Sequence, residues 1–387
     1  MTAAPDFTSI NDEFTRLVVD DLGRCRSDEA VLVEAPPGAG KSSLTVSVAN
    51  ELITQDPKLR LPVVTQTNEQ ADDLVAALRK RHPAVDVARL HGGSGPSTAM
   101  VTLAGPGLVL SSDHDSKDVQ DARVVVSTAR KWEFVRSKQQ QDGTIRKYEL
   151  ALIDEAYQMR SDALLGIAGL FDRLLCVGDP GQLDPFTTVD DALWKGLQHS
   201  PSRTAMGTLR AFHPDLAEHQ LPTSWRLPPS AAQIVSTAFY PFSSFDPGTD
   251  ATQRQLVLNG TRSTGDDDVL DLAASAGWAY VELPEKLTVR TDTEIATRLA
   301  GIVDRLLDRG ANLTDELEPT GRTLERKDIA IVAAHNDQVH AARYALDQAG
   351  VDPDSIVVST ANKVQGREYE VVLVWHPLAG RRDATAF

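Results

Sequence analysis

The sequence has few cysteines, few aromatic residues and no long apolar run, and each scarcity excludes a class of protein. Its 387 residues include two cysteines, Cys25 and Cys176, which form no Cys-x-x-Cys pair. This argues against a disulfide framework or a cysteine-based zinc site and predicts two reduced thiols. No stretch approaches the roughly 18 apolar residues of a membrane span, and the first 14 residues lack the basic and apolar regions of a secretory signal. We therefore expect a cytoplasmic protein.

Basic residues are also scarce relative to acidic ones. Lys and Arg number 39 against 55 Asp and Glu, which gives a formal net charge of −16. This is the wrong sign for a protein that coats a phosphate backbone. It does not exclude nucleic acid, because a motor needs only a local track that is basic or lined by backbone. The composition, 41% hydrophobic and 24% charged, is that of a globular protein, and the length predicts two domains.

Short apolar runs alternate with segments of helical periodicity along the whole chain. This pattern predicts an α/β fold with mainly parallel sheets and helices on both faces. Predicted strands in the first half are 30–33, 61–65, 123–126, 150–153 and 174–177, and in the second half 280–282, 329–332, 357–358 and 371–374. We expect two domains, residues 1–205 and 206–387, with a small insertion at about 92–148 in the first.

The first predicted strand leads into Ala35–Ser42 (APPGAGKS), which follows the P-loop pattern except that alanine replaces the first glycine. Glycines allow backbone N–H groups to turn toward phosphate oxygens, and the start of the next helix adds a positive field. Lys41 is expected to reach the β- and γ-phosphates of ATP, and Ser42 to bind Mg²⁺. The predicted nucleotide-binding residues are Pro37, Gly38, Ala39, Gly40, Lys41, Ser42 and Ser43.

Two acids follow the strand at 150–153. Asp154 is predicted to hold Mg²⁺, and Glu155 to orient and deprotonate the attacking water. In this interpretation the two carboxylates and the P-loop form one site of phosphoryl transfer, because the carboxyl ends of parallel strands meet at one edge of a sheet.

Two further polar residues are predicted to sense the γ-phosphate. Gln182 lies in the string Gly178–Pro185 (GDPGQLDP), which follows the strand at 174–177. Arg226 lies in Leu221–Pro228 (LPTSWRLP), and we expect it to reach the nucleotide from the second domain as an arginine finger.

These strings occur in the order found in superfamily 1 helicases, and the chain resembles the branch that contains RNA-surveillance and 5′-to-3′ DNA helicases. The strings that carry the resemblance are Ala35–Ser42, Thr65–Asn68, Asp154–Ala156, Gly178–Pro185, Ser224–Arg226 and Thr360–Glu370. The resemblance implies two tandem RecA-like P-loop NTPase domains. It also implies ATP hydrolysis with Mg²⁺, coupled to movement along single-stranded DNA or RNA.

The resemblance also assigns roles to further residues. Gly366 and Glu368 are predicted to lie near the ribose and γ-phosphate. The predicted contacts to the nucleic-acid backbone are Thr65, Thr67, Ser127, Thr128 and Thr360. Hydroxyl and N–H groups at strand ends suit this role because they hold phosphates without reading bases. Trp132 is the one aromatic residue considered for base stacking, although packing in a core is the favoured interpretation.

The chain departs from the family pattern in two further ways. The glutamine motif that recognises adenine in many relatives is not recognisable before Val31, and the last family motif is not found before Phe387. We therefore expect a truncated second domain. Two alternatives stay open. One is a nucleotide-dependent switch that recruits a protein partner such as a nuclease, which the missing motif and the net charge favour. The other is a nucleic-acid-binding module without hydrolysis, against which Lys41 and Glu155 argue.

Overall fold

The computed structural model describes residues 7–27, 29–93, 95–182, 185, 193–194, 200, 202–241, 243–250, 253–284, 291–315 and 320–379. The chain folds into two compact units. The first comprises Met1–Leu227 and Ala232–Gly248, and the second comprises Pro228–Ala231 and Thr249–Phe387. Within the described residues, no helix combines the length and the apolar character that crossing a bilayer requires.

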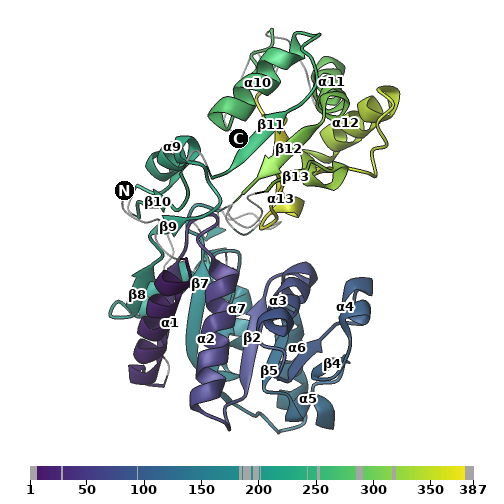
Figure 1. The fold of residues 1–387 in the computed structure, drawn as a ribbon. Helices are drawn as coiled ribbons and strands as arrows, with labels where there is room; N and C mark the ends of the chain where they lie inside the picture. The colour runs from purple at the N-terminus through teal and green to yellow at the C-terminus, as the bar shows by residue number, and fades with distance from the viewer. Residues whose placement is uncertain are drawn as a thin grey trace. The chain divides into compact units, whose positions relative to one another are not determined.

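An eight-stranded sheet forms the centre of the first unit, in the order β4-β3-β5-β2-β6-β7-β1-β8 (Figure 1). All neighbouring strands run parallel. The strands are β1 (Ala30–Glu34), β2 (Leu61–Thr65), β3 (Val87–Leu90), β4 (Leu108–Ser111), β5 (Val124–Thr128), β6 (Tyr148–Ile153), β7 (Phe171–Gly178) and β8 (Ala217–Gln220). Because they are parallel, all eight carboxyl ends lie along the same edge.

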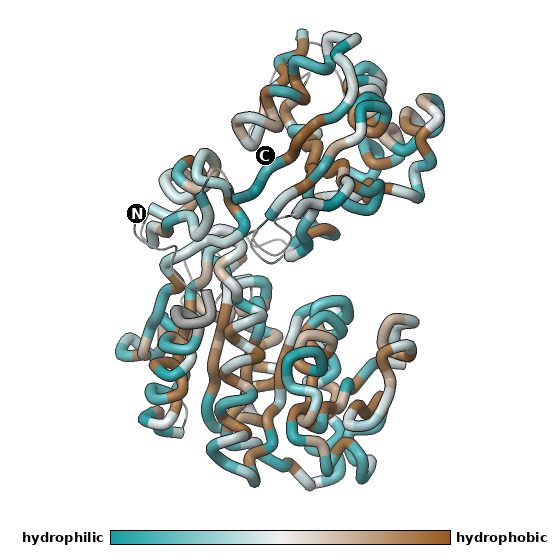
Figure 2. Tube along the Cα trace, in the orientation of Figure 1, coloured by the Kyte–Doolittle hydropathy of each residue, from teal (hydrophilic) through white to brown (hydrophobic). Residues whose placement is uncertain are grey.

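Helices cover both faces of this sheet, and each face has its own apolar core. One face packs against α1 (Phe7–Arg24), α2 (Lys41–Gln55), α3 (Asn68–Arg81) and α4 (Thr98–Leu103). The other packs against α5 (Lys117–Asp121), α6 (Ala129–Gln141), α7 (Ser161–Ala168) and α8 (Ala205–Phe212). Successive strand residues alternate between the two cores, so the strands are apolar on both sides and appear brown in Figure 2.

The first unit differs from the sequence-based expectation in two respects. The segment expected to be an insertion at 92–148 supplies α4 to α6 and the interior strand β5, which pairs with both β3 and β2. The unit also continues beyond the boundary expected at residue 205, because β8 pairs with β1 over Ala217–Gln220. After β8, strands β9 (Thr223–Ser224) and β10 (Asp246–Pro247) pair in parallel and flank α9 (Pro229–Phe239).

The second unit contains two three-stranded sheets around one core. One is parallel, with β14 (Ile329–Ala333) between β15 (Val357–Thr360) and β16 (Val371–Val374). The other is antiparallel and consists of β11 (Gln255–Leu258), β12 (Ala311–Thr314) and β13 (Arg322–Thr323). The helices are α10 (Asp266–Ala276), α11 (Thr293–Arg309), α12 (Asn336–Gln348), α13 (Ala361–Val364) and the short 3-10 helix η2 (Arg326–Asp328).

The three predicted strands at 329–332, 357–358 and 371–374 are confirmed as β14, β15 and β16. The prediction at 280–282 is wrong, since these residues form no strand and Tyr280 is 74% exposed. Strands β11 and β12 were not predicted. Their exposed residues alternate with half-buried or buried ones, which is a weak apolar pattern over only four residues.

Trp132 lies at the centre of a buried aromatic cluster in the first unit. Its ring is fully buried and packs edge-to-face against His114, Tyr148 and Phe171. Its Nε1 donates a hydrogen bond to the carbonyl of Val63 at 3.4 Å. The residue considered for base stacking is therefore a core residue.

His114 links this cluster to a charged surface loop. Its Nε2 lies 2.6 Å from the Tyr148 hydroxyl, and its Nδ1 lies 3.3 Å from a carboxylate oxygen of Asp115. A neutral ring satisfies both contacts when Nδ1–H donates to Asp115 and Nε2 accepts from Tyr148. Burial is the main cause of the lowered pKa of His114, with Arg60 and Arg146 adding to it and Asp115 opposing it.

We expect the parent protein to lose stability relative to a His114→Gln variant as the pH falls below about 6.5. The folded-state pKa of His114 is depressed, so the unfolded chain takes up the proton first. The stabilising contribution of the neutral ring is therefore complete above the unfolded pKa and is lost as the pH falls from there through the folded pKa. Denaturant unfolding of both proteins between about pH 5 and pH 8 measures the difference. A difference independent of pH contradicts the prediction.

Candidate active site

The loop between β1 and α2 has the backbone shape of a phosphate-binding loop. Gly38 and Gly40 have φ angles of 70° and 90°, which favour glycine. The Ala39 N–H donates to the carbonyl of Pro36 at 3.1 Å, which tightens the turn. Gly40 is the N-cap of α2 and supplies no capping side chain. The helix therefore begins as phosphate-binding helices do, with its first turn capped by glycine rather than by a polar side chain.

Other predicted P-loop residues have defined positions. Ser42 is exposed in the first turn of α2, where its hydroxyl suits a metal ion beside a phosphate. The Ser43 hydroxyl instead accepts a 2.5 Å hydrogen bond from Arg81 of α3, and this contact ties α2 to α3. The carbonyl of Pro37 accepts a 2.6 Å hydrogen bond from Ser224.

Lys41 is part of a buried cluster of charges at the carboxyl ends of β6 and β7. Its Nζ lies 3.3 Å from Oδ2 of Asp179 and 3.6 Å from Oε1 of Glu155. The three side chains are 10%, 1% and 11% exposed, respectively. Two carboxylates thus hold the ammonium at the base of the loop. The structure brings the predicted catalytic residues Lys41 and Glu155 together.

Asp154 and Glu155 directly follow β6 and differ in environment. Burial and the neighbouring carboxylate of Glu155 raise the pKa of Asp154 to about 7, while Lys41 opposes this shift. Asp154 is 5% exposed, and a hydrogen bond with Thr45 of α2 favours its charged form. Glu155 has a φ of 54°, and it is the one described non-glycine residue with a positive φ. This backbone conformation is strained and typical of functional sites.

These residues fit a magnesium ion bound together with a nucleotide. Mg²⁺ usually takes one or two carboxylates and completes its octahedron with water and phosphate oxygens. Asp154 supplies a buried carboxylate whose pKa is raised by burial and by the neighbouring Glu155, and Ser42 supplies a hydroxyl. Among the described residues, no group of three or more His, Cys, Asp or Glu could hold a metal ion by protein side chains alone.

Asp179 connects the predicted sensor Gln182 to this cluster. The Oδ2 atom of Asp179, which faces Lys41, accepts a 3.3 Å hydrogen bond from Nε2 of Gln182. Its Oδ1 accepts hydrogen bonds from Gly181 N–H at 3.1 Å and from the hydroxyl of Tyr240. Gln182 therefore lies beside the P-loop lysine, as a sensor requires.

Two members of this arrangement, Asp179 and Tyr240, were not predicted from the sequence. Asp179 lies within the GDPGQ string and was not assigned a role there. Tyr240 directly follows α9, far along the chain, and is 4% exposed. No local pattern marks it. In the string Gly178–Pro185, Leu183 and Asp184 lie outside the described residues.

Arg226 belongs to the same compact unit as the P-loop, contrary to the expectation that it reaches the nucleotide from a second domain. The Trp225 N–H donates to the carbonyl of Gly38 at 3.0 Å. A Cβ atom on Gly38 would lie 2.1 Å from Cβ of Arg226. The reason is the pairing of β8 with β1, which carries the following segment alongside the P-loop.

The structure separates the predicted nucleic-acid contacts of the first unit into two kinds. Thr65 and Ser127 are fully buried, and their hydroxyls donate to the carbonyls of Thr67 and Leu90. These two side chains shape loops and face away from solvent. Thr67 is exposed and caps α3, and the half-buried Thr128 caps α6. Their loops lie at the carboxyl ends of β2 and β5.

Three predicted site residues lie in the second unit. Thr360 is the last residue of β15 and the N-cap of α13. Gly366 has a φ of 83° and open space around its Cα, and Glu368 is exposed. Thr360 thus lies at the carboxyl end of a parallel strand, which is where ligands bind in such sheets. Gly366 and Glu368 lie in the following loop between α13 and β16.

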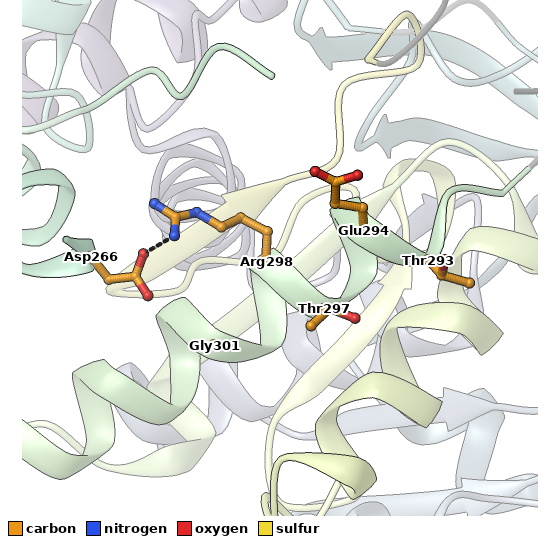
Figure 3. Close-up of a pocket in the computed structure, with 6 residues that line it drawn as sticks. All are labelled: Asp266, Thr293, Glu294, Thr297, Arg298 and Gly301. Atoms are coloured by element: carbon orange, nitrogen blue, oxygen red, sulfur yellow. Dashed lines mark ion pairs between the residues drawn. The ribbon is translucent and has the colours of Figure 1, made fainter. Parts of the chain in front are cut away.

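The second unit also contains an open hollow of about 560 Å³ along α11. Its lining residues are Asp266, Thr293, Glu294, Thr297, Arg298 and Gly301. Figure 3 shows Arg298 directed at Asp266, with which it forms an ion pair. The cationic group is thus neutralised within the hollow. No phosphate-binding loop borders these six residues, so we do not assign the nucleotide to this hollow.

A glycine-capped loop between a strand and a helix, with a lysine and two carboxylates at the sheet edge, defines a P-loop nucleotide-binding domain. Comparison with known families finds two matching family models. One family model described as "AAA domain" matches residues 23–188, and a second with the same description matches residues 203–376. Together they span most of the chain. This pair of AAA domains is typical of superfamily 1 helicases, and the chain belongs to that superfamily.

No curated protein matches the chain in a direct sequence search. Among solved structures, the helicase of PRRSV has 15% identity and a TM-score of 0.35, with 89% of this chain and 54% of that chain covered. The arterivirus nonstructural protein 10, a helicase solved in complex with DNA, has 12% identity and a TM-score of 0.38, with 92% and 62% covered. The chain thus spans less than two thirds of either structure.

A Gly38→Ala substitution is expected to weaken ATP binding by about fivefold or more. The methyl group would meet the backbone of Arg226 and force a side chain into a φ of 70°, a strain of about 1–3 kcal/mol. Titration with a fluorescent ATP analogue measures the loss. Gly23→Ala on α1 is the matched control, because an added Cβ there meets nothing within 4 Å. Equal affinities for the two variants contradict the account of the loop.

Proposed function

We propose that the chain hydrolyses ATP with Mg²⁺ and uses the reaction to move along single-stranded DNA or RNA. Lys41 holds the β- and γ-phosphates, Ser42 and Asp154 hold Mg²⁺, and Glu155 activates the attacking water. Gln182 and Arg226 contact the γ-phosphate. The observation that carries the proposal is the position of Lys41 between Asp179 and Glu155 at the glycine-capped start of α2.

The environment of Glu155 supports its assignment as the general base. Its carboxylate is almost buried and lies 3.6 Å from the ammonium of Lys41, so a water molecule between them and a γ-phosphate would be oriented by fixed charges. Its backbone is strained, with a φ of 54°, two residues after the end of β6. Oδ1 of the preceding residue, Asp154, accepts a 3.2 Å hydrogen bond from the backbone N–H of Glu155. The two acids are therefore suited to different roles.

The order of the strands supports a nucleic-acid track beside this site. Strand β2 pairs with β6 on one side and with β5 on the other, and Thr65 is in register with Thr128. The loops that carry Thr67 and Thr128 therefore leave the sheet edge next to each other, and the loop with Thr67 also lies next to the loop with Asp154 and Glu155. Helix N-termini and hydroxyls at this edge can hold the phosphates of one strand. We also assign Thr360 to the track, and Gly366 and Glu368 to the nucleotide.

The first test measures ATP turnover with and without single-stranded oligonucleotides. We expect oligo-dT, oligo-U or both to raise the turnover, because contacts at Thr67 and Thr128 stabilise the arrangement in which hydrolysis occurs. Blunt duplex DNA of the same length is the control. Turnover that neither strand changes removes the translocase from consideration. Tight ATP binding with slow turnover would then favour the nucleotide-dependent switch.

Glu155→Gln is expected to lower the turnover of ATP by about 10²- to 10⁴-fold, because the amide cannot accept the proton of the attacking water. Binding of a non-hydrolysable ATP analogue should stay within about threefold of the parent, since the side chain keeps its size.

The matched control is Glu149→Gln on the same strand, where the carboxylate is 63% exposed and forms an ion pair with Arg173. Its turnover should equal that of the parent. A Glu155→Gln variant with unchanged turnover would indicate binding without hydrolysis.

A further inference from the structure

Three glutamine side chains form a continuous hydrogen-bonded chain in the first unit. Nε2 of Gln70, on α3, donates to Oε1 of Gln158 at 3.1 Å. Nε2 of Gln158, in the turn after β6, donates to Oε1 of Gln182 at 2.9 Å. Nε2 of Gln182 donates to Asp179 at 3.3 Å, and the chain ends at the carboxylate that holds Lys41.

The far end of the chain reaches the loop after β2. Oε1 of Gln70 accepts hydrogen bonds from the backbone N–H groups of Gln66 and Thr67, each at 3.1 Å. The Gln70 N–H in turn donates to the Thr67 hydroxyl, which completes the capping box of α3. Gln70 thus fixes the backbone of the loop that we assign to the nucleic-acid track.

Every amide in this chain uses its oxygen toward one neighbour and its nitrogen toward the next. The direction is the same throughout, from the loop N–H groups to the anionic Asp179. A movement at one end of this hydrogen-bonded series is therefore transmitted to the other end, because each amide must reorient or shift when its partner moves. The members come from three separate segments of sequence, at the ends of β2, β6 and β7.

We propose that Gln158 and Gln70 are positioning residues that couple nucleotide occupancy to the shape of the loop at Gln66 and Thr67. Lys41 is shared between Asp179 and the site of the phosphates. A triphosphate draws this ammonium away from Asp179 and offers Gln182 a second acceptor. The resulting shift of Gln182 passes through Gln158 to Gln70 and changes the hydrogen bonds that hold the loop. This inference rests on the proposed function for the identity of the ligands at its two ends.

Hydrogen exchange tests the coupling without any nucleic acid. In the parent, Mg²⁺ with a non-hydrolysable ATP analogue is expected to change the exchange rate of the Gln66 and Thr67 amides by about fivefold or more. In a Gln158→Leu variant, which keeps the side-chain volume and removes the amide, the change should fall below about twofold. Protection of the first turn of α2 by the analogue must persist in both proteins, which shows that the nucleotide is bound.

Oligonucleotide binding supplies the second measurement. The analogue is expected to change the Kd of the parent for oligo-dT by about fivefold or more, and that of Gln158→Leu by less than about twofold. In the double variant with Gln70→Leu, the effect of the analogue on this Kd should be no smaller than in Gln158→Leu alone, because both substitutions interrupt the same series of hydrogen bonds. Gln55→Leu is the control, because Gln55 bonds only locally to Glu51 on the exposed side of α2.

The outcomes separate the two proposals. The coupling is overturned if the analogue does not change the exchange of the Gln66 and Thr67 amides in the parent. It is also overturned if the analogue changes this exchange equally in the parent and in Gln158→Leu. Exchange that follows the expectation while no oligonucleotide binds leaves the coupling standing and rejects the track. If Gln158→Leu does not fold, Gln158→Asn replaces it. The shorter side chain keeps the amide yet spans the gap between Gln70 and Gln182 poorly, and it should show the same loss.

Discussion

The burial of one lysine between two carboxylates is the constraint on which the site depends. Lys41, Asp179 and Glu155 are nearly inaccessible to solvent, so each charge requires the others or a ligand. Asp154 adds a fourth ionisable group whose pKa is raised to about 7. Asp179 and Glu155 alone place two carboxylates against the one ammonium of Lys41. A magnesium ion bound with a nucleotide would place a divalent cation beside Asp154, which ties nucleotide binding to the loops that hold these carboxylates.

The parallel sheet brings these charges together. Strands β6, β7 and β1 are neighbours, so the loops with Asp154, Asp179 and the P-loop leave the same edge side by side. The next neighbours, β2 and β5, place Thr67 and Thr128 along that edge. A single architecture thus supplies a site for phosphates and an adjacent surface of helix N-termini. On the other side, β8 pairs with β1 and returns the chain to the P-loop, where Arg226 packs against Gly38.

Two of the polar residues that the resemblance assigns to nucleic acid act as structural groups. Thr65 and Ser127 occupy positions predicted to grip nucleic acid, yet both are buried and bonded to backbone carbonyls. Their hydroxyls hold loops whose exposed members, such as Thr67, remain available to a ligand. Gln182, in contrast, contacts the charge cluster itself, because its Nε2 donates a hydrogen bond to Asp179. The same strings therefore contain residues of the site and residues that position it.

Local patterns in the sequence were sufficient to predict the P-loop, the acids after β6 and half of the strands that the structure describes. These features depend on near neighbours: apolar runs of four to six residues, glycines at positions of positive φ, and a lysine at the first position of a helix. The contacts between distant segments were not predictable. Tyr240 on Asp179, Arg226 on Gly38 and the chain from Gln70 to Gln182 all join residues far apart in sequence. Their proximity follows from the order of the strands and the pairing of β8, which depend on how the whole sheet packs rather than on any short string.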